Sequence, residues 1–175
     1  MRSFLVCLAA LLLAACGEMQ ALPESTQVLG PPLQSFAAHG RISLRQGERS
    51  DHLQFDWQHA PGRDVVLFSS PLGQGLAELG RDASGAWLLV PGEAERREPD
   101  LGALAQRLFG APLPLDLLAE WLRGAQPALV GEVEGWRIAV TESAPWRQHQ
   151  LPRRLEVRRG DIELRIVIDD WGDGD

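Results

Sequence analysis

Apolar and polar residues alternate with a period of two along much of the chain. The alternating stretches are residues 40–45, 52–58, 136–140, 155–157 and 161–168. In an extended chain this pattern places apolar side chains on one face and polar ones on the other, so it predicts half-buried β-strands. Apolar runs at 65–68 and 87–90 also have strand length. Turn residues at 60–62, 82–85 and 159–160 separate these stretches, and such short connections predict antiparallel neighbours.

Two helices are predicted where the alternation stops. Asp100 is a typical N-cap of a first helix, and Gly110 a typical end. Within it, Leu101, Leu104 and Leu108 share one side. We predict a mainly β fold with helices (α+β), in which a curved antiparallel sheet carries the helices across its apolar concave side.

The second helix is predicted to open with Pro114 at its first position and to close at Gly124. Its apolar stripe consists of Leu115, Leu118, Trp121 and Leu122. The pattern leaves two interpretations open for the space between helices and sheet. It is either a solid core or a lined cavity for acyl chains.

The N-terminus has the pattern of a bacterial lipoprotein signal. Arg2 is followed by an apolar run at 4–13 that is too short to span a bilayer, and then by Leu13-Ala14-Ala15-Cys16. In such a lipobox the chain is cut before the cysteine, whose thiol then carries a diacylglyceryl group. Cys16 is thus the predicted lipid anchor.

The chain divides into four predicted segments. They are a signal peptide at 1–15, a lipidated N-terminus and proline-containing tether at 16–35, one folded domain at 36–171 and an acidic tail at 172–175.

Composition narrows the possible functions. Without residues 1–15, 16 arginines face 24 acidic residues, a net charge of about −8, which argues against nucleic acid as a partner. The chain has no lysine, which excludes a P-loop lysine and Schiff-base chemistry. The four histidines lack metal-ligand spacing, and no nucleophile motif is present. The sequence therefore predicts no catalytic residue, no metal site and no cofactor, and the protein is not expected to be an enzyme.

One turn carries an unusual side chain. Ser70-Pro71-Leu72-Gly73 lies between two apolar segments, and a Pro-x-Gly turn is normal there. Leucine is not a usual turn residue, however. From the residues alone, Leu72 either folds back onto the sheet or points into solvent.

Five stretches of the chain, 36–43, 70–74, 113–115, 121–124 and 151–171, carry a further signal. Together, and in this order, they resemble the LolB family of outer-membrane lipoproteins. The resemblance implies an incomplete antiparallel β-barrel with a helical lid over an apolar cavity. It also implies a protruding loop, here Pro71, Leu72 and Gly73, whose leucine promotes release of cargo into the membrane.

The resemblance further implies a function and partners. The protein is expected to be a monomer on the periplasmic face of the outer membrane. It would accept acylated lipoproteins from a periplasmic carrier and insert them into outer-membrane lipid by passive transfer. The expected cavity residues are Ile42, Leu44, Leu53, Phe55, Trp57, Leu164 and Ile166 on the walls, with Leu118, Trp121 and Leu122 on the lid. Two alternatives remain: a lipid-anchored carrier or sensor of free lipids, and a scaffold lipoprotein with a solid core.

Overall fold

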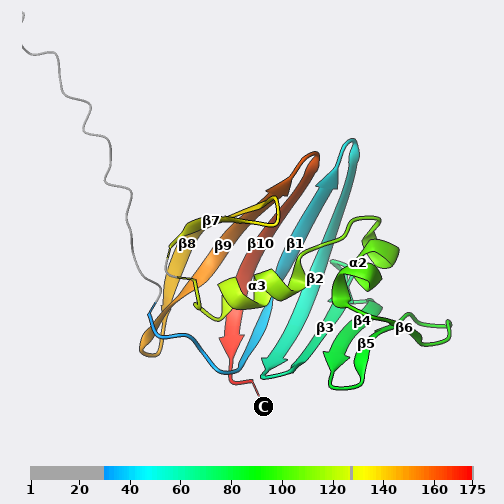
Figure 1. Cartoon of the computed structure of the whole chain (residues 1–175), viewed down its shortest axis with the longest axis horizontal. Helices are drawn as coiled ribbons and strands as arrows, with labels where there is room; N and C mark the ends of the chain where they lie inside the picture. The colour runs from blue at the N-terminus through cyan, green and yellow to red at the C-terminus, as the bar shows by residue number, and fades with distance from the viewer. Residues whose placement is uncertain (1–29, 127, 175) are drawn as a thin grey trace, which may run out of the picture.

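The computed structural model describes residues 30–126 and 128–174, which form one antiparallel sheet and two helices (Figure 1). The elements are β1 (Phe36–Gln46), β2 (Arg49–Ala60), β3 (Arg63–Ser69), β4 (Gly75–Asp82), β5 (Gly85–Leu89), β6 (Arg96–Glu98), α2 (Leu101–Phe109), α3 (Leu115–Leu122), β7 (Val130–Val133), β8 (Trp136–Trp146), β9 (His149–Arg159) and β10 (Ile162–Gly172). The predicted α+β class is confirmed.

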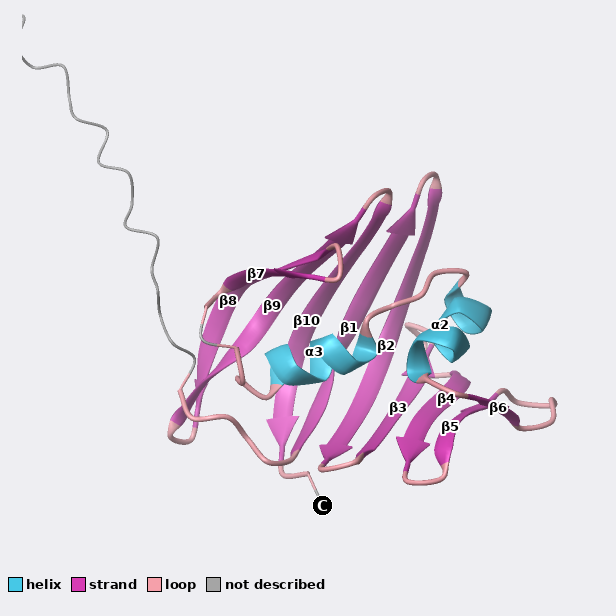
Figure 2. Ribbon diagram, in the orientation of Figure 1, coloured by secondary structure: helices cyan, strands magenta, loops and turns pink. Residues whose placement is uncertain are grey.

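The ten strands form a single curved sheet in the order β6-β5-β4-β3-β2-β1-β10-β9-β8-β7. Every described strand pair is antiparallel, and β1 joins the two halves by pairing with both β2 and β10. The strands do not close into a full barrel, because β6 and β7 remain as the edges. Both helices cover one face of the sheet, with α3 crossing β10 and β1 (Figure 2). The expected incomplete barrel with a helical lid is therefore present.

The predicted alternation decides which face each strand buries. In β1, Ile42 and Leu44 are buried, while Arg41 and Arg45 on either side of them are exposed. Ile42 stands between Leu53 of β2 and Ile166 of β10 in the register. These apolar faces meet α2 and α3 in one continuous core.

Gly40 interrupts β1 for a steric reason. The pairing of β1 with β10 shifts between His39 and Gly40, as at a β-bulge. A Cβ atom at Gly40 would collide with the carbonyl oxygen of Val167 and touch the ring of Phe55. Glycine permits this close approach of two strands.

The helix ends follow the sequence signals, with one correction. Asp100 accepts a hydrogen bond from the Ala103 amide at 2.8 Å, and Gly110 ends α2 in the left-handed conformation. Pro114 was predicted as the first residue of α3, but its φ of −84° and ψ of 62° place it at the preceding cap position. It therefore lies outside the helical turn that begins at Leu115.

The end of α3 is a Schellman motif. The amide of Ala125 donates to the carbonyl of Glu120 at 3.0 Å, and that of Gly124 to Trp121 at 3.2 Å. Gly124 has a φ of +77°, which a residue with a Cβ adopts only at a cost. The predicted end at Gly124 is confirmed.

The C-terminal residues lie beside the start of β1. Ser35 Oγ donates to the Gly174 carbonyl at 3.1 Å, and Arg147 forms a bidentate ion pair with Asp173. Although it is paired, Asp173 keeps 64% of its side chain exposed.

Candidate functional site

The layer between α3 and the sheet is apolar throughout. Its lining consists of Ile42, Leu44, Leu53, Phe55, Trp57, Val66, Phe68, Phe109, Leu113, Leu115, Leu118, Leu122, Leu164 and Ile166. Nine of the ten expected cavity residues are in this set, and they come from β1, β2, β10 and α3. The structure therefore gathers widely separated positions under one helix, and we refer to this set as the apolar layer.

Trp121 is the expected residue that the structure places elsewhere. Its side chain is 2% exposed and packs toward β7, where a Cβ on Gly131 would lie 2.9 Å from the indole ring. The indole Nε1 is buried and has no hydrogen-bond partner among the residues that the structure describes. Trp121 thus fixes α3 to the edge of the sheet instead of lining the layer.

The apolar layer is filled by its own side chains. Its free volume is about 10 Å³, roughly the room that one water molecule requires. Leu118 and Leu122 of α3 reach the sheet and are 1% and 0% exposed. An acyl chain therefore has no space in this conformation unless α3 moves.

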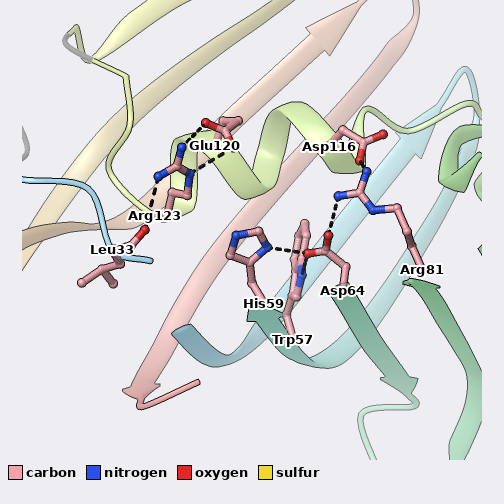
Figure 3. Close-up of polar contacts among 8 residues, drawn as sticks. All are labelled: Leu33, Trp57, His59, Asp64, Arg81, Asp116, Glu120 and Arg123. Carbon is pink, nitrogen blue, oxygen red and sulfur yellow. Dashed lines mark hydrogen bonds and ion pairs between the residues drawn. The ribbon is translucent and has the colours of Figure 1, made fainter. Parts of the chain in front are cut away.

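The N-terminal end of α3 is held by an ion-pair relay (Figure 3). Asp116, in the first turn of α3, pairs with the guanidinium group of Arg81 on β4. The same group donates to Asp64 on β3 at 2.5 Å. We call these three residues the clasp. It links α3 to strands β3 and β4 of the sheet.

Asp64 is the buried end of the clasp. Only 1% of its side chain is exposed, and it also contacts Trp57 Nε1 at 3.0 Å and His59 Nδ1 at 2.8 Å. Burial by itself raises the pKa of Asp64, but the hydrogen bonds from His59, Trp57 and Arg81 outweigh it and hold this pKa below its usual value of 3.8. A charged carboxylate therefore anchors the relay at neutral pH.

The C-terminal end of α3 is held by the segment that precedes β1. The amide of Leu33 donates to the carbonyl of Arg123 at 2.8 Å, and Arg123 donates back to the Leu33 carbonyl at 3.3 Å (Figure 3). Glu120 orients the Arg123 side chain through two hydrogen bonds. Both ends of the lid are thus fastened by polar contacts at the rim of the apolar layer.

The loop between β3 and β4 presents Leu72 to solvent. The Gly73 amide donates to the Ser70 carbonyl at 2.8 Å, and Ser70 and Gln74 close the loop by a second backbone bond of 2.8 Å. Gly73 has a φ of +83°. Leu72 sits at the tip with 97% of its side chain exposed, so it does not fold back onto the sheet.

The remaining residues considered from the sequence either contact nearby residues or lie outside the residues that the structure describes. His39 pairs with Asp56 at 2.7 Å, and the His149 ring contacts the Pro31 carbonyl at 3.1 Å. Within 30–126 and 128–174, no cluster of three potential metal ligands occurs and no helix is long and apolar enough to cross a membrane. Cys16 lies outside the described residues.

Comparisons with known sequences agree on one family. The family model described as "Outer membrane lipoprotein LolB" matches residues 34–171. A protein named outer-membrane lipoprotein LolB from Azoarcus sp. strain BH72 is 34% identical, over 95% of this chain and 93% of its own length. One of the same name from Chromobacterium violaceum is 30% identical, over 93% and 94%.

Solved structures share the fold. A LolA superfamily protein from Nitrosomonas europaea superposes with a TM-score of 0.55 at 10% identity, covering 87% of this chain and 91% of that one. A DUF1329 family protein from Desulfovibrio piger gives the same score at 12% identity, covering 80% and 85%. At such identities the likeness concerns the fold alone.

Proposed function

The chain belongs to the LolB family of outer-membrane lipoproteins, and from this premise we propose that it is a receptor in lipoprotein localisation. It receives acylated lipoproteins from a LolA-like periplasmic carrier and passes them to the outer membrane. The observation that carries the proposal is the apolar layer, which lies beneath a short helix and is lined entirely by apolar side chains.

The need for such a layer follows from the cost of exposing acyl chains to water. A buried methylene group contributes about 0.8 kcal/mol, so a sixteen-carbon chain left in water costs on the order of 12 kcal/mol. Lipoproteins carry up to three such chains. They require an apolar shelter at each step between membranes.

The filled layer suits passive exchange. When α3 lifts, Leu118 and Leu122 lose contacts with the sheet, and an incoming acyl chain supplies equivalent apolar contacts. The net cost of opening is then mainly the loss of the polar fastenings at Asp116 and Leu33. Such a site needs no nucleotide to release its cargo, because a bilayer offers the chains a still larger apolar volume.

Two residues are proposed to act at the outer membrane. We propose that Cys16 carries the lipid anchor on the periplasmic face of the outer membrane and that Leu72 contacts the bilayer during delivery. A fully exposed leucine on a short loop costs about 1.5–3 kcal/mol relative to burial in lipid. This suffices for brief contact but is too little for anchoring.

Transfer of cargo in two separate steps tests the function. A purified carrier loaded with a labelled lipoprotein is mixed with this protein, and the complex is then mixed with liposomes. We expect cargo to move at both steps without nucleotide. Failure of the folded protein to take any cargo from the carrier contradicts the receptor function.

A scaffold with a permanently closed core is the second candidate, and the free volume of about 10 Å³ favours it. Saturable binding of a long-chain fatty acid distinguishes the two, because a closed core binds none. A carrier or sensor of free lipids would instead copurify with phospholipid.

A further inference from the structure

The face of the sheet opposite the helices has a hollow over its central strands. In the register, Arg45 lies between Ser50 of β2 and Glu163 of β10. Two residues earlier on β1, Ser43 lies between His52 and Arg165 in the same way. These side chains alternate with the buried Ile42 and Leu44, so they point away from the apolar layer.

Two adjoining depressions make up this hollow, and both are lined by Ser43 and Arg165. One has a volume of about 170 Å³ and is completed by Arg45, Ser50 and Glu163. The other, of about 310 Å³, extends along β1 and β2 as far as Pro71 of the Leu72 loop. We call them together the arginine hollow. It leads from the central strands to the foot of the loop.

Glu163 organises the arginine side chains of the hollow. It accepts hydrogen bonds from Arg45 at 2.5 Å, Arg165 at 2.8 Å and Arg158 at 3.4 Å, and only 10% of its side chain is exposed. Arg158, which lies beside the hollow and does not line it, has a second partner in Glu156 at 2.9 Å. Three guanidinium groups thus share two carboxylates, and one positive charge is left over.

The other charges near the hollow do not cancel this surplus. Arg41 lines the wider depression and is neutralised by Asp169 through two hydrogen bonds. Arg45 and Arg165 remain 62% and 59% exposed, so their guanidinium groups can still contact a ligand. In a chain of net charge −7, this hollow is a local site for an anion.

We propose that the arginine hollow binds the phosphodiester group of a membrane phospholipid while Leu72 enters the adjacent acyl region. A phosphodiester carries one negative charge, which matches the surplus charge of the cluster. Guanidinium groups bind phosphate oxygens with paired hydrogen bonds, and the hydroxyl groups of Ser43 and Ser50 are further donors.

The position of the hollow beside the Leu72 loop favours a phospholipid over free phosphate as its ligand. The wider depression includes Pro71, and Leu72 follows directly with its side chain in solvent. Gln54, which also lines the depression, contacts the Pro71 carbonyl at 3.5 Å. An apolar tip beside a basic hollow fits the acyl and head-group layers of one lipid surface. The part of this inference that concerns Leu72 rests on its proposed contact with the membrane.

The test compares two kinds of vesicle by flotation. One contains phosphatidylethanolamine and phosphatidylglycerol, and the other only galactolipids, which lack phosphate. The mature chain from residue 16 is used with Cys16→Ala, so that neither the signal peptide nor the lipid anchor dominates binding. We expect tighter binding to the phospholipid vesicles. Arg165→Gln should weaken that binding about fivefold, as for one arginine near an anionic surface, and leave galactolipid binding unchanged.

The matched control is Arg96→Gln on the edge strand β6, which removes the same charge from a different exposed pair. It should leave both bindings unchanged. Equal binding of the wild type to both vesicles, or equal losses in Arg165→Gln and Arg96→Gln, overturns the proposal. Titration with inorganic phosphate forms a further arm. Saturable binding of phosphate without any preference for phospholipid vesicles overturns the lipid assignment.

Leu72→Glu separates this inference from the proposed function. If Leu72 contacts lipid, the variant loses binding to both vesicle types. If only Arg165→Gln has an effect, the hollow binds head groups and the role of Leu72 in the proposed function fails.

Discussion

The guanidinium group of Arg81 donates a hydrogen bond of 2.5 Å to the buried carboxylate of Asp64. Arg81 also pairs with Asp116 on α3, so a charge inside the sheet is connected to the lid helix. Because the side chain of Arg81 is 35% exposed, it stands at the boundary between core and solvent. Asp64, the buried end of the clasp, therefore supports the fold. The exposed ion pair between Arg81 and Asp116 can break without unfolding the protein.

Removal of the buried end should damage the fold. Asp64→Ala leaves Trp57, His59 and Arg81 without their shared acceptor, and breaking a buried charge pair costs about 3 kcal/mol. Urea denaturation should show this loss in the free energy of unfolding. The control is Asp169→Ala, whose partner Arg41 is exposed, and which should change stability by about 1 kcal/mol or less. Equal losses in both variants would contradict the role of Asp64.

The clasp also predicts a dependence of stability on acid. The pKa of Asp64 is lower in the folded state than its unfolded value of 3.8, so the unfolded chain binds more protons and stability rises with pH in this window. The contribution is complete above pH 3.8 and disappears as pH falls through the lower folded pKa. Urea denaturation at several pH values should show a shallower acid dependence for Asp64→Asn than for the wild type. An unchanged dependence would exclude Asp64 as its source.

Release of the outer end should loosen the lid without unfolding the protein. Asp116 is 51% exposed, and exposed ion pairs contribute up to about 1 kcal/mol, so Asp116→Asn should speed amide exchange within 115–122 by up to roughly fivefold. Hydrogen exchange followed by mass spectrometry measures this directly. Glu95→Gln, which breaks an exposed pair with Arg97, serves as the control. Unchanged exchange in Asp116→Asn would show that the clasp does not restrain α3.

Much of the sheet could be predicted because one-faced strands leave a period of two in the sequence. The edge strands could not. Arg96–Glu98 is wholly charged, and Val130–Val133 has Gly131 and Glu132 at its centre. Such edges are defined by backbone pairing with a neighbour and not by an apolar face.

The residues of the candidate site also divide into those that the sequence predicts and those that it does not. Ile42, Leu118 and Leu164 could be assigned to the layer because each lies on an apolar face. The clasp leaves no local signal, because Asp64 and Arg81 join Asp116 only after β3, β4 and α3 have packed. Patterns of apolar residues therefore predict cores, while polar contacts between distant elements require the structure.

Trp57 should report entry of ligand into the apolar layer. It lines the layer, so an acyl chain that displaces α3 changes its surroundings, and tryptophan fluorescence should shift saturably when a long-chain fatty acid is added. Trp57→Phe should reduce this change, and the remainder should come from Trp121, which moves with α3. Trp146→Phe is the control, because Trp146 is half-buried outside the layer and donates to the Trp171 carbonyl at 3.1 Å. The absence of saturable change in the folded wild type would support the closed scaffold.

Leu72 should act at delivery and not at capture. Its side chain is 97% exposed and contributes little to packing, so Leu72→Glu should fold and still accept cargo from the carrier. Placing one leucine in lipid is worth about 1.5–3 kcal/mol, which corresponds to a roughly ten- to hundredfold change in the release rate. Transfer to liposomes should therefore slow by that factor in Leu72→Glu, while Leu72→Phe retains most of it.

The matched control for this variant is Val130→Glu. Val130 is 49% exposed on the edge strand β7, so the change adds the same charge at an apolar surface position outside the loop. Scoring carrier-to-receptor and receptor-to-membrane transfer separately locates the defect. Normal delivery by Leu72→Glu would remove Leu72 from the mechanism. Equal loss of both steps would assign the loop a structural role, since a side chain that acts only on the bilayer leaves the apolar layer and its lid unchanged.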